Sequence, residues 1–168
     1  MAEFLFVSPQ EMAQTSILGG NIDTDRIVFN IADTQISVIE PLLGTILYDK
    51  IVIEASGNTL TGLYLTLYTE YIQPITKYEA IAKYIEIAPY FMDNGGVFKR
   101  LADNKEIAPK EEVTTLAEKY HSIAQLYIKR FEKWICYSTN RIPEYFTYIV
   151  TDKVTPLNDI DLTAGWKL

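Results

Sequence analysis

The chain has few of the side chains that carry out covalent chemistry. Its 168 residues include one histidine, His121, and one cysteine, Cys136. A nucleophile and its base must lie within hydrogen-bond reach, but these two are separated by about 22 Å along one predicted helix. A zinc site needs a cluster of three or four His, Cys or carboxylate ligands, which the sequence does not show. We therefore expect no catalytic residue, no metal ligand, no cofactor and no enzymatic activity, with His121 on the surface and Cys136 a small buried hydrophobe.

Basic clusters and long apolar runs are also missing. The chain has 15 Lys and Arg against 22 Asp and Glu, a formal net charge of −7. Non-specific DNA binding depends on cations that neutralise phosphates, so this composition argues against it. No apolar run approaches the roughly 18 residues of a membrane span, and the N-terminus lacks the basic region of a signal peptide. A single cysteine excludes an intrachain disulfide framework. We expect a soluble protein made in a cytoplasm, with no membrane partner.

Helix signals fill the first third of the chain. Residues 8–11, Ser-Pro-Gln-Glu, have the pattern of a capping box with proline at the first helical position. Asp23 or Thr24 caps a second helix, which Pro41 disturbs near its end. Thr45 can cap a third helix. Residues at helical spacing mark a buried face in the second helix, Ile27, Ile31, Thr34 or Gln35 and Val38, and the third helix carries the apolar residues Ile46, Leu47, Ile51 and Val52.

The middle of the chain predicts an interrupted helix and then a small insertion. Residues 61–73 are apolar on nearly every side, as in a helix central to a core. Pro74 kinks this helix or starts a new one, and residues 94–96, Asn-Gly-Gly, end it. Residues 95–108 have weak helical periodicity and a turn candidate at residues 103–104. We expect a β-hairpin or an ordered loop there.

A long C-terminal helix is the clearest prediction. Pro109 suits the first helical position, and Glu111 and Glu112 complement the helix dipole. An apolar stripe then steps by three and four residues from Val113 to Ile135. A helix over residues 109–138 would be roughly 45 Å long. That length is large for a domain of this size, so part of the stripe can face another chain.

The last part of the chain is more polar. Residues 144–150 are rich in tyrosine and alternate as a short strand does, and residues 151–168 predict an extended C-terminal arm. Trp166 is a large apolar residue near the end of this polar arm, so we expect its side chain to be buried against a protein surface. It either folds back onto its own domain or anchors the arm in a pocket of a neighbour. The fold class is therefore all-α, a compact helical bundle over residues 1–150 with one long C-terminal helix, the 95–108 insertion and the arm.

Tyrosine is in excess, with 12 residues. Its ring is apolar and its hydroxyl is polar, so tyrosine suits protein interfaces that are partly exposed to solvent. A core whose phenol groups reach its edge would give the same composition. The candidate interface residues are Tyr120, Tyr127, Trp134, Tyr145, Tyr148 and Trp166.

Three ordered features resemble the helical head–tail connector proteins of tailed phages, most closely the ring proteins of crAss-like phages. The first is Gly20-Asn21-Ile22-Asp23, residues 20–23, which opens a helix running to Leu47-Tyr48. The second is Tyr71-Ile72-Gln73-Pro74, residues 71–74, followed by a Gly-Gly-Val stop. The third is the long helix from Pro109, which leads to Ile142-Pro143-Glu144-Tyr145. Together they cover about residues 4–148.

This resemblance implies a structural virion protein at the head–tail junction, assembled in the host cytoplasm. It implies a homo-oligomeric ring, typically of twelve copies, that sits under the portal protein and docks further ring or tail proteins. DNA would pass through the channel without specific binding, and an acidic lumen would let it slide. A ring needs a closing head-to-tail interface, which a long amphipathic helix and a tyrosine surplus can supply. The alternative is a non-viral helical adaptor that binds a partner protein.

Overall fold

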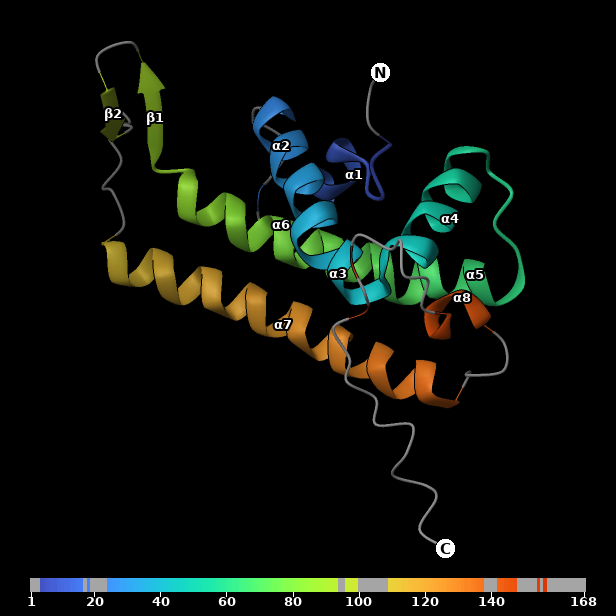
Figure 1. The fold of residues 1–168 in the computed structure, drawn as a ribbon. Coiled ribbons are helices and arrows are strands. Elements are labelled where there is room, and N and C mark those ends of the chain that lie inside the picture. The colour runs from blue at the N-terminus through green and yellow to red at the C-terminus, as the bar shows by residue number, and fades with distance from the viewer. Residues whose placement is uncertain are drawn as a thin grey trace, which may run out of the picture.

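The computed structural model describes residues 4–16, 18, 24–93, 96–99, 109–137, 142–147, 154 and 156. Helices make up most of this part of the chain, and the predicted all-α class is confirmed (Figure 1). The predicted long C-terminal helix is α7 (Lys110–Tyr137). It packs along α6 (Gln73–Ile87), and α2 (Thr24–Thr34) packs on α6 as well. The α6 helix is therefore the centre around which the bundle is arranged.

Two of the helices pass through a proline without ending. The first consists of α2, the π-helical turn η1 (Gln35–Ile39) and α3 (Glu40–Leu43). The second consists of α5 (Gly62–Leu67), the π-helical turn η2 (Tyr68–Ile72) and α6. Each π-turn ends two residues before a proline, Pro41 or Pro74.

The π-turns explain why these prolines are tolerated. Proline has no N–H and clashes with the carbonyl four residues earlier. In the structure, the residue just before each proline donates its N–H five residues back, Glu40 to the Gln35 carbonyl and Gln73 to the Tyr68 carbonyl. This wider turn makes room for the ring. The break predicted at Pro74 is a local widening of one continuous helix.

The insertion between α6 and α7 contains a β-hairpin, displaced from the predicted position. Strands β1 (Tyr90–Asp93) and β2 (Gly96–Lys99) pair antiparallel, with Asp93 opposite Gly96. The connecting residues are therefore Asn94-Gly95, the pair most typical of a two-residue hairpin turn. Our prediction used residues 94–96 as a helix end and expected the turn at residues 103–104, which lie outside the described residues.

Buried apolar side chains form two clusters. The large core joins the N-terminal segment to η1, α3, α4 (Thr45–Ser56), α5, η2, α6, α7 and α8 (Pro143–Phe146). Its members are Phe6, Ile39, Leu42, Leu43, Leu47, Tyr48, Ile51, Leu67, Tyr71, Ile72, Ile75, Phe131, Ile135, Ile142 and Tyr145. The small core joins α1 (Pro9–Gln14), α2, α6 and α7. Its members are Val7, Met12, Ala13, Ile27, Ile31, Ala80, Ile81, Tyr84, Ile85 and Ala117.

A buried amide holds the N-terminal segment against the large core. The Phe6 N–H donates to Gln35 Oε1 at 2.8 Å, and Gln35 Nε2 donates to the Phe4 carbonyl at 3.0 Å. The Phe6 carbonyl also accepts from the Tyr68 hydroxyl and from Gln73 Nε2. Because this backbone has no strand or helix partner, the side chains satisfy its polar groups.

Several local predictions are corrected by the structure. Helix α1 begins at Pro9, but the Ser8 side chain bonds Gln10 and caps no backbone N–H. Thr45 is the first residue of α4, whose N-cap is Gly44. Residues 143–146 form the short helix α8 instead of a strand, because proline at its start favours a helical turn.

The structure also bears on the predictions of a central apolar helix and of an extended C-terminal arm. Helix α5 lies at the edge of the core and leaves Leu65 exposed, so the central apolar segment begins only at Leu67. Within the predicted C-terminal arm, Val154 and Pro156 lie against the α3–α4 corner. The Thr45 N–H donates to the Val154 carbonyl at 3.1 Å, and the Val154 N–H donates to Thr45 Oγ1 at 3.2 Å.

Candidate interaction surface

A groove lies between α1, α6 and α7. It consists of two adjoining hollows of about 210 and 380 Å³, which share Lys77 and Tyr78. The smaller hollow is also lined by Val7, Glu11, Thr69, Gln73, Pro74 and Tyr127. The larger is also lined by Thr15, Ser16, Leu116, Lys119, Tyr120 and Ile123.

A ladder of three tyrosines forms one wall of this groove. Tyr78 of α6 stacks with Tyr120 and with Tyr127 of α7, with ring centroids 6.3 and 5.8 Å apart and interplanar angles of 29° and 18°. Tyr120 and Tyr127 are seven residues apart, so they lie two turns apart on one face of α7. All three side chains are half-buried. Offset stacking at these distances is favourable, and the half-exposed rings remain open to a partner.

Cations lie beside the middle ring of the tyrosine ladder and at its Tyr127 end. Lys77 Nζ is 5.9 Å from the Tyr78 ring centroid and donates to the Thr15 carbonyl and hydroxyl. Arg130 Cζ is 5.4 Å from the Tyr127 ring centroid. Lys119 is exposed at the edge of the larger hollow. A groove of stacked phenols with cations at its rim suits an aromatic or acidic side chain of another protein.

The structure brings together two of the six predicted interface residues, Tyr120 and Tyr127. Trp134 is half-buried and packs its ring 5.2 Å from the Tyr71 ring, beside the large core. Tyr145 is only 1% exposed, so it is a core residue and not a surface for a partner. Tyr148 and Trp166 lie outside the described residues. Sequence reasoning missed Tyr78, although its place on the apolar face of the helix that precedes α7 was a usable signal.

Outside the groove, exposed apolar side chains occur singly on α4, α5 and α6, at Ile53, Leu65 and Ile87, and recur along one face of two helices. On α2 and η1, Phe29 is 66% exposed and Ile36 is 53% exposed. On α7, Leu126 is 57% exposed and Tyr137 is 93% exposed. Apolar side chains at this exposure, repeated along one helix face, are typical of an interaction surface. The predicted apolar stripes did not include these residues because they lie on the opposite helix faces.

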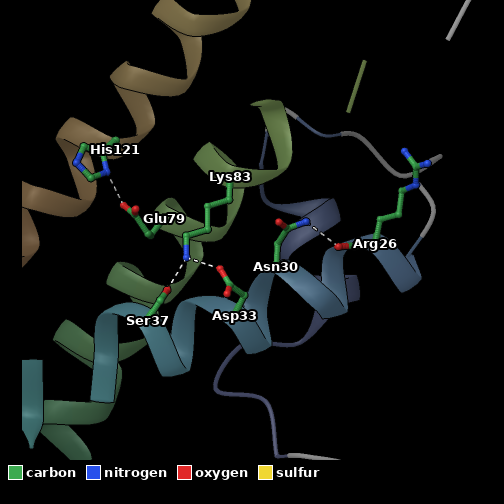
Figure 2. A network of polar contacts seen from close by, with 7 residues as sticks. All are labelled: Arg26, Asn30, Asp33, Ser37, Glu79, Lys83 and His121. Carbon is green, nitrogen blue, oxygen red and sulfur yellow. Dashed lines mark hydrogen bonds and ion pairs between the residues drawn. The ribbon is translucent and has the colours of Figure 1, made fainter. Parts of the chain in front are cut away.

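Polar contacts connect α2, α6 and α7 across the bundle (Figure 2). Lys83 Nζ of α6 lies 2.6 Å from Asp33 Oδ2 and 2.6 Å from Ser37 Oγ. One turn earlier on α6, Glu79 Oε2 lies 2.8 Å from His121 Nδ1 of α7. Glu79 is 7% exposed, so the histidine supplies the partner that a buried carboxylate needs. These contacts fix the two neighbours of α6 in place.

A second polar group attaches α8 to α4 and α5. Lys50 Nζ is 2.6 Å from Glu144 Oε1, the Tyr64 hydroxyl donates to Glu144 Oε2 at 2.8 Å, and Lys50 lies 4.0 Å from the Tyr64 ring centroid. The hydrogen bond to Glu144 raises the pKa of Lys50, against the opposing effect of burial. Burial raises the pKa of Glu144, but hydrogen bonds from Lys50, its own backbone and Tyr64 outweigh it and lower the pKa. Burial raises the pKa of Tyr64.

The side chains that could act in catalysis or bind a metal ion do not cluster within the described part of the chain. Over the described ranges, no group of three or more His, Cys, Asp or Glu side chains could hold a metal ion. His121 is half-exposed, as predicted, and its partner is Glu79. Cys136 is exposed, contrary to our prediction, because it follows the buried Ile135 and so faces away from α6. No helix in the described part of the chain is long and apolar enough to cross a membrane.

Comparison with known proteins adds one relationship. A family model described as "Family of unknown function (DUF6712)" matches residues 39–152, more than half of the chain. The chain belongs to the DUF6712 family. No curated protein and no solved structure matches it. The DUF6712 match includes the tyrosine ladder and the Lys50–Glu144 contact, and it begins after α1 and α2.

Proposed function

We propose that this protein is a structural virion protein, a head–tail connector that forms a homo-oligomeric ring under the portal. The ring extends the DNA channel and docks the next tail component. One observation carries the proposal. Two helices each expose a pair of large apolar side chains by more than half, Phe29 and Ile36 on α2–η1 and Leu126 and Tyr137 on α7, whereas α4 exposes the single Ile53 to that extent. A ring needs two different contact surfaces on each subunit, since each copy contacts its two neighbours differently.

The arrangement of the helices supports the same role. The two surfaces belong to α2 and α7, and both helices pack on α6, which separates them (Figure 1). A subunit with contact surfaces on two sides can be repeated around an axis. The net charge of −7 supports a channel that DNA passes through without specific binding, because an excess of carboxylates repels phosphates.

The experiment is the native mass of the purified protein, alone and mixed with a candidate portal protein, with negative-stain images of each. Rings, alone or on the portal, are the expected result. A chain that stays monomeric and ignores the portal at high concentration would overturn the proposal. Mixing with an unrelated acidic helical protein serves as the control for non-specific association.

The groove favours a second candidate, a non-viral helical adaptor that binds a partner protein. Its half-buried tyrosine ladder and cationic rim suit an aromatic or acidic segment of a partner. The same measurements separate the two functions. An adaptor remains a monomer or dimer at every concentration, and Tyr78→Ala removes its partner binding. A connector forms rings whose formation depends on α2 and α7.

A further inference from the structure

The exposed face of α2 and the helix that continues it alternates carboxylates with apolar residues. Asp25, Phe29, Asp33, Ile36 and Glu40 follow one another at steps of four, four, three and four residues. This spacing places them along one helix face, over a length of roughly 22 Å. Asp33 keeps 48% of its side chain exposed even though Lys83 pairs with one of its oxygens. We call this row of five residues the acidic stripe.

Exposed cations are concentrated in the part of α7 from Lys119 onward, after the exposed Glu111, Glu112 and Glu118. Leu126, Lys129, Lys133 and Tyr137 are exposed and lie along the face opposite the buried residues of α7, and Lys119, at the edge of the groove, extends the same row. We call this row the basic stripe; its length is roughly 27 Å. Within the part of the chain that the structure describes, none of its three lysines takes part in an ion pair. An unpaired row of cations around two exposed apolar residues, in a chain with a net charge of −7, is complementary to the acidic stripe.

The two stripes of one molecule cannot meet, because α6 lies between α2 and α7 (Figure 1). Contact of a stripe with its own copy is also unfavourable, since it would oppose carboxylates to carboxylates or lysines to lysines. The remaining pairing is acidic against basic, between different copies. We propose that the acidic stripe of one copy packs on the basic stripe of the next, as the repeating head-to-tail contact of the ring. This inference rests on the proposed connector function and names its subunit interface.

The size of the stripes predicts how this contact behaves. A helix face of roughly 27 by 10 Å covers about 270 Å², well below the about 800 Å² per partner of a standard stable interface. A single contact between two copies is therefore weak. A closed ring is more stable because every copy makes two contacts, so association rises steeply with protein concentration and decreases with salt.

Reciprocal charge reversal tests the contact. The acidic-stripe variant carries Asp25→Lys and Glu40→Lys, and the basic-stripe variant carries Lys129→Glu and Lys133→Glu. Asp33 is left unchanged because its ion pair with Lys83 joins α2 to α6. Glu40 accepts a hydrogen bond from the Thr45 hydroxyl in its own chain, so the folding of this variant is checked as described below. Each variant alone places like charges against each other, so we expect its self-association to weaken at least about tenfold. Mixed together, the two variants again present opposite charges at every contact, and the mixture should assemble as the wild type does.

Matched controls exclude general effects of charge. Asp49→Lys with Glu86→Lys changes two exposed carboxylates outside the acidic stripe, and Lys110→Glu changes an exposed lysine of α7 outside the basic stripe. Both should assemble normally. Phe29→Ser should weaken association, whereas Ile53→Ser, which removes a 70% exposed apolar side chain elsewhere, should not. Circular dichroism and urea unfolding of each variant establish that it folds.

The outcomes separate this inference from the connector function. Rescue of assembly in the mixture, with each variant alone defective, supports the stripe contact. If the wild type forms rings and each charge-reversal variant alone also assembles normally, the proposed stripe contact is wrong. The proposed connector function would not be contradicted by that result. Wild-type protein that stays monomeric at millimolar concentration, measured by light scattering, also overturns the contact. Ring formation on the portal, seen by negative stain, then tests the function separately.

Discussion

The large core and the small core stabilise the bundle with different side chains. In the large core, Phe6, Tyr48 and Tyr68 meet edge to face, as do Phe131 and Tyr145. The small core is mostly aliphatic and contains three alanines, Ala13, Ala80 and Ala117. Alanines let helices approach closely but fill little volume, and half-buried Tyr120 packs at the rim of the small core, whereas Tyr127 packs against the large core. The comparison indicates that the large core provides most of the stability and that the groove lies where the two cores adjoin.

The strongest test of this comparison is Phe131→Ala. Phe131 is 0% exposed and lies among the aromatic rings of the large core. Its removal leaves a cavity and should lower the free energy of unfolding by about 3–5 kcal/mol, measured by urea denaturation. The control on the same helix is Leu126→Ala, at an exposed position, which should change it by about 0.5 kcal/mol or less. Equal losses in the two variants would contradict the assignment of the large core.

A smaller effect is expected from Gln35→Leu, which removes the amide that holds the N-terminal segment. The Phe6 N–H and the Phe4 carbonyl both lose their partner, and a buried unsatisfied group costs about 1–3 kcal/mol. We expect a loss of about 2–3 kcal/mol, together with faster hydrogen exchange at the Phe6 amide. Gln125→Leu on α7 is the control, since its amide has only a 3.5 Å contact with His121. An unchanged hydrogen-exchange rate at the Phe6 amide would show that Gln35 does not hold the N-terminal segment in place.

Gly44→Ala tests the corner where the large core meets the C-terminal part of the chain. Gly44 has φ +75°, and an added Cβ would lie 2.7 Å from Pro156 Cδ. Backbone strain of this kind costs about 1–3 kcal/mol, and the melting temperature should fall accordingly. Gly57→Ala is the matched control, because Gly57 has φ −82° and no neighbour closer than 3.4 Å. Gly57→Ala should leave the melting temperature unchanged or raise it slightly. A lower melting temperature for Gly57→Ala than for Gly44→Ala would contradict the role assigned to Gly44.

The smallest expected effect is the pH dependence of the contact between α8 and α4. Glu144 has a lower pKa in the folded chain than its ordinary value of 4.5, so the unfolded chain binds the proton first. The stabilisation is present above about pH 4.5 and is lost as the pH falls through the folded pKa. Lys50 and Tyr64 have raised pKa values, so their stabilisation is lost only above their ordinary range, near pH 10. Glu144→Gln should flatten the acid part of the stability profile, measured by thermal melts at a series of pH values.

The elements that sequence predicted well have strong local signals. The long helix α7 follows from a stripe that repeats over about six turns, and its first-turn glutamates mark where it begins. The buried face of α2 follows from the same spacing, with Ile27 and Ile31 both 0% exposed. These signals lie in residues that are neighbours in sequence, so no knowledge of tertiary contacts was needed to find them.

The elements that sequence missed depend on tertiary contacts. Nothing near Gln35 indicates that its side chain bonds a segment about thirty residues earlier. The hairpin was misplaced because residues 94–96 fit a helix end as well as a turn. The tyrosine ladder requires the register of α6 on α7, which depends on the packing of these two helices in both cores. The stripes were missed because a search for buried faces passes over the exposed ones.

The pairing of Thr45 with Val154 has a consequence for synthesis of the chain. These residues are 109 positions apart, and Phe131, Ile142 and Tyr145 of the large core also come late in the sequence. The residues of the small core have all been synthesised once Ala117 has left the ribosome. At that stage the large core still lacks Phe131, Ile135, Ile142 and Tyr145. The first half of the nascent chain therefore waits with its aromatic side chains exposed until translation is nearly finished. A pause in translation before residue 131 prolongs the stage at which the chain is most prone to aggregate.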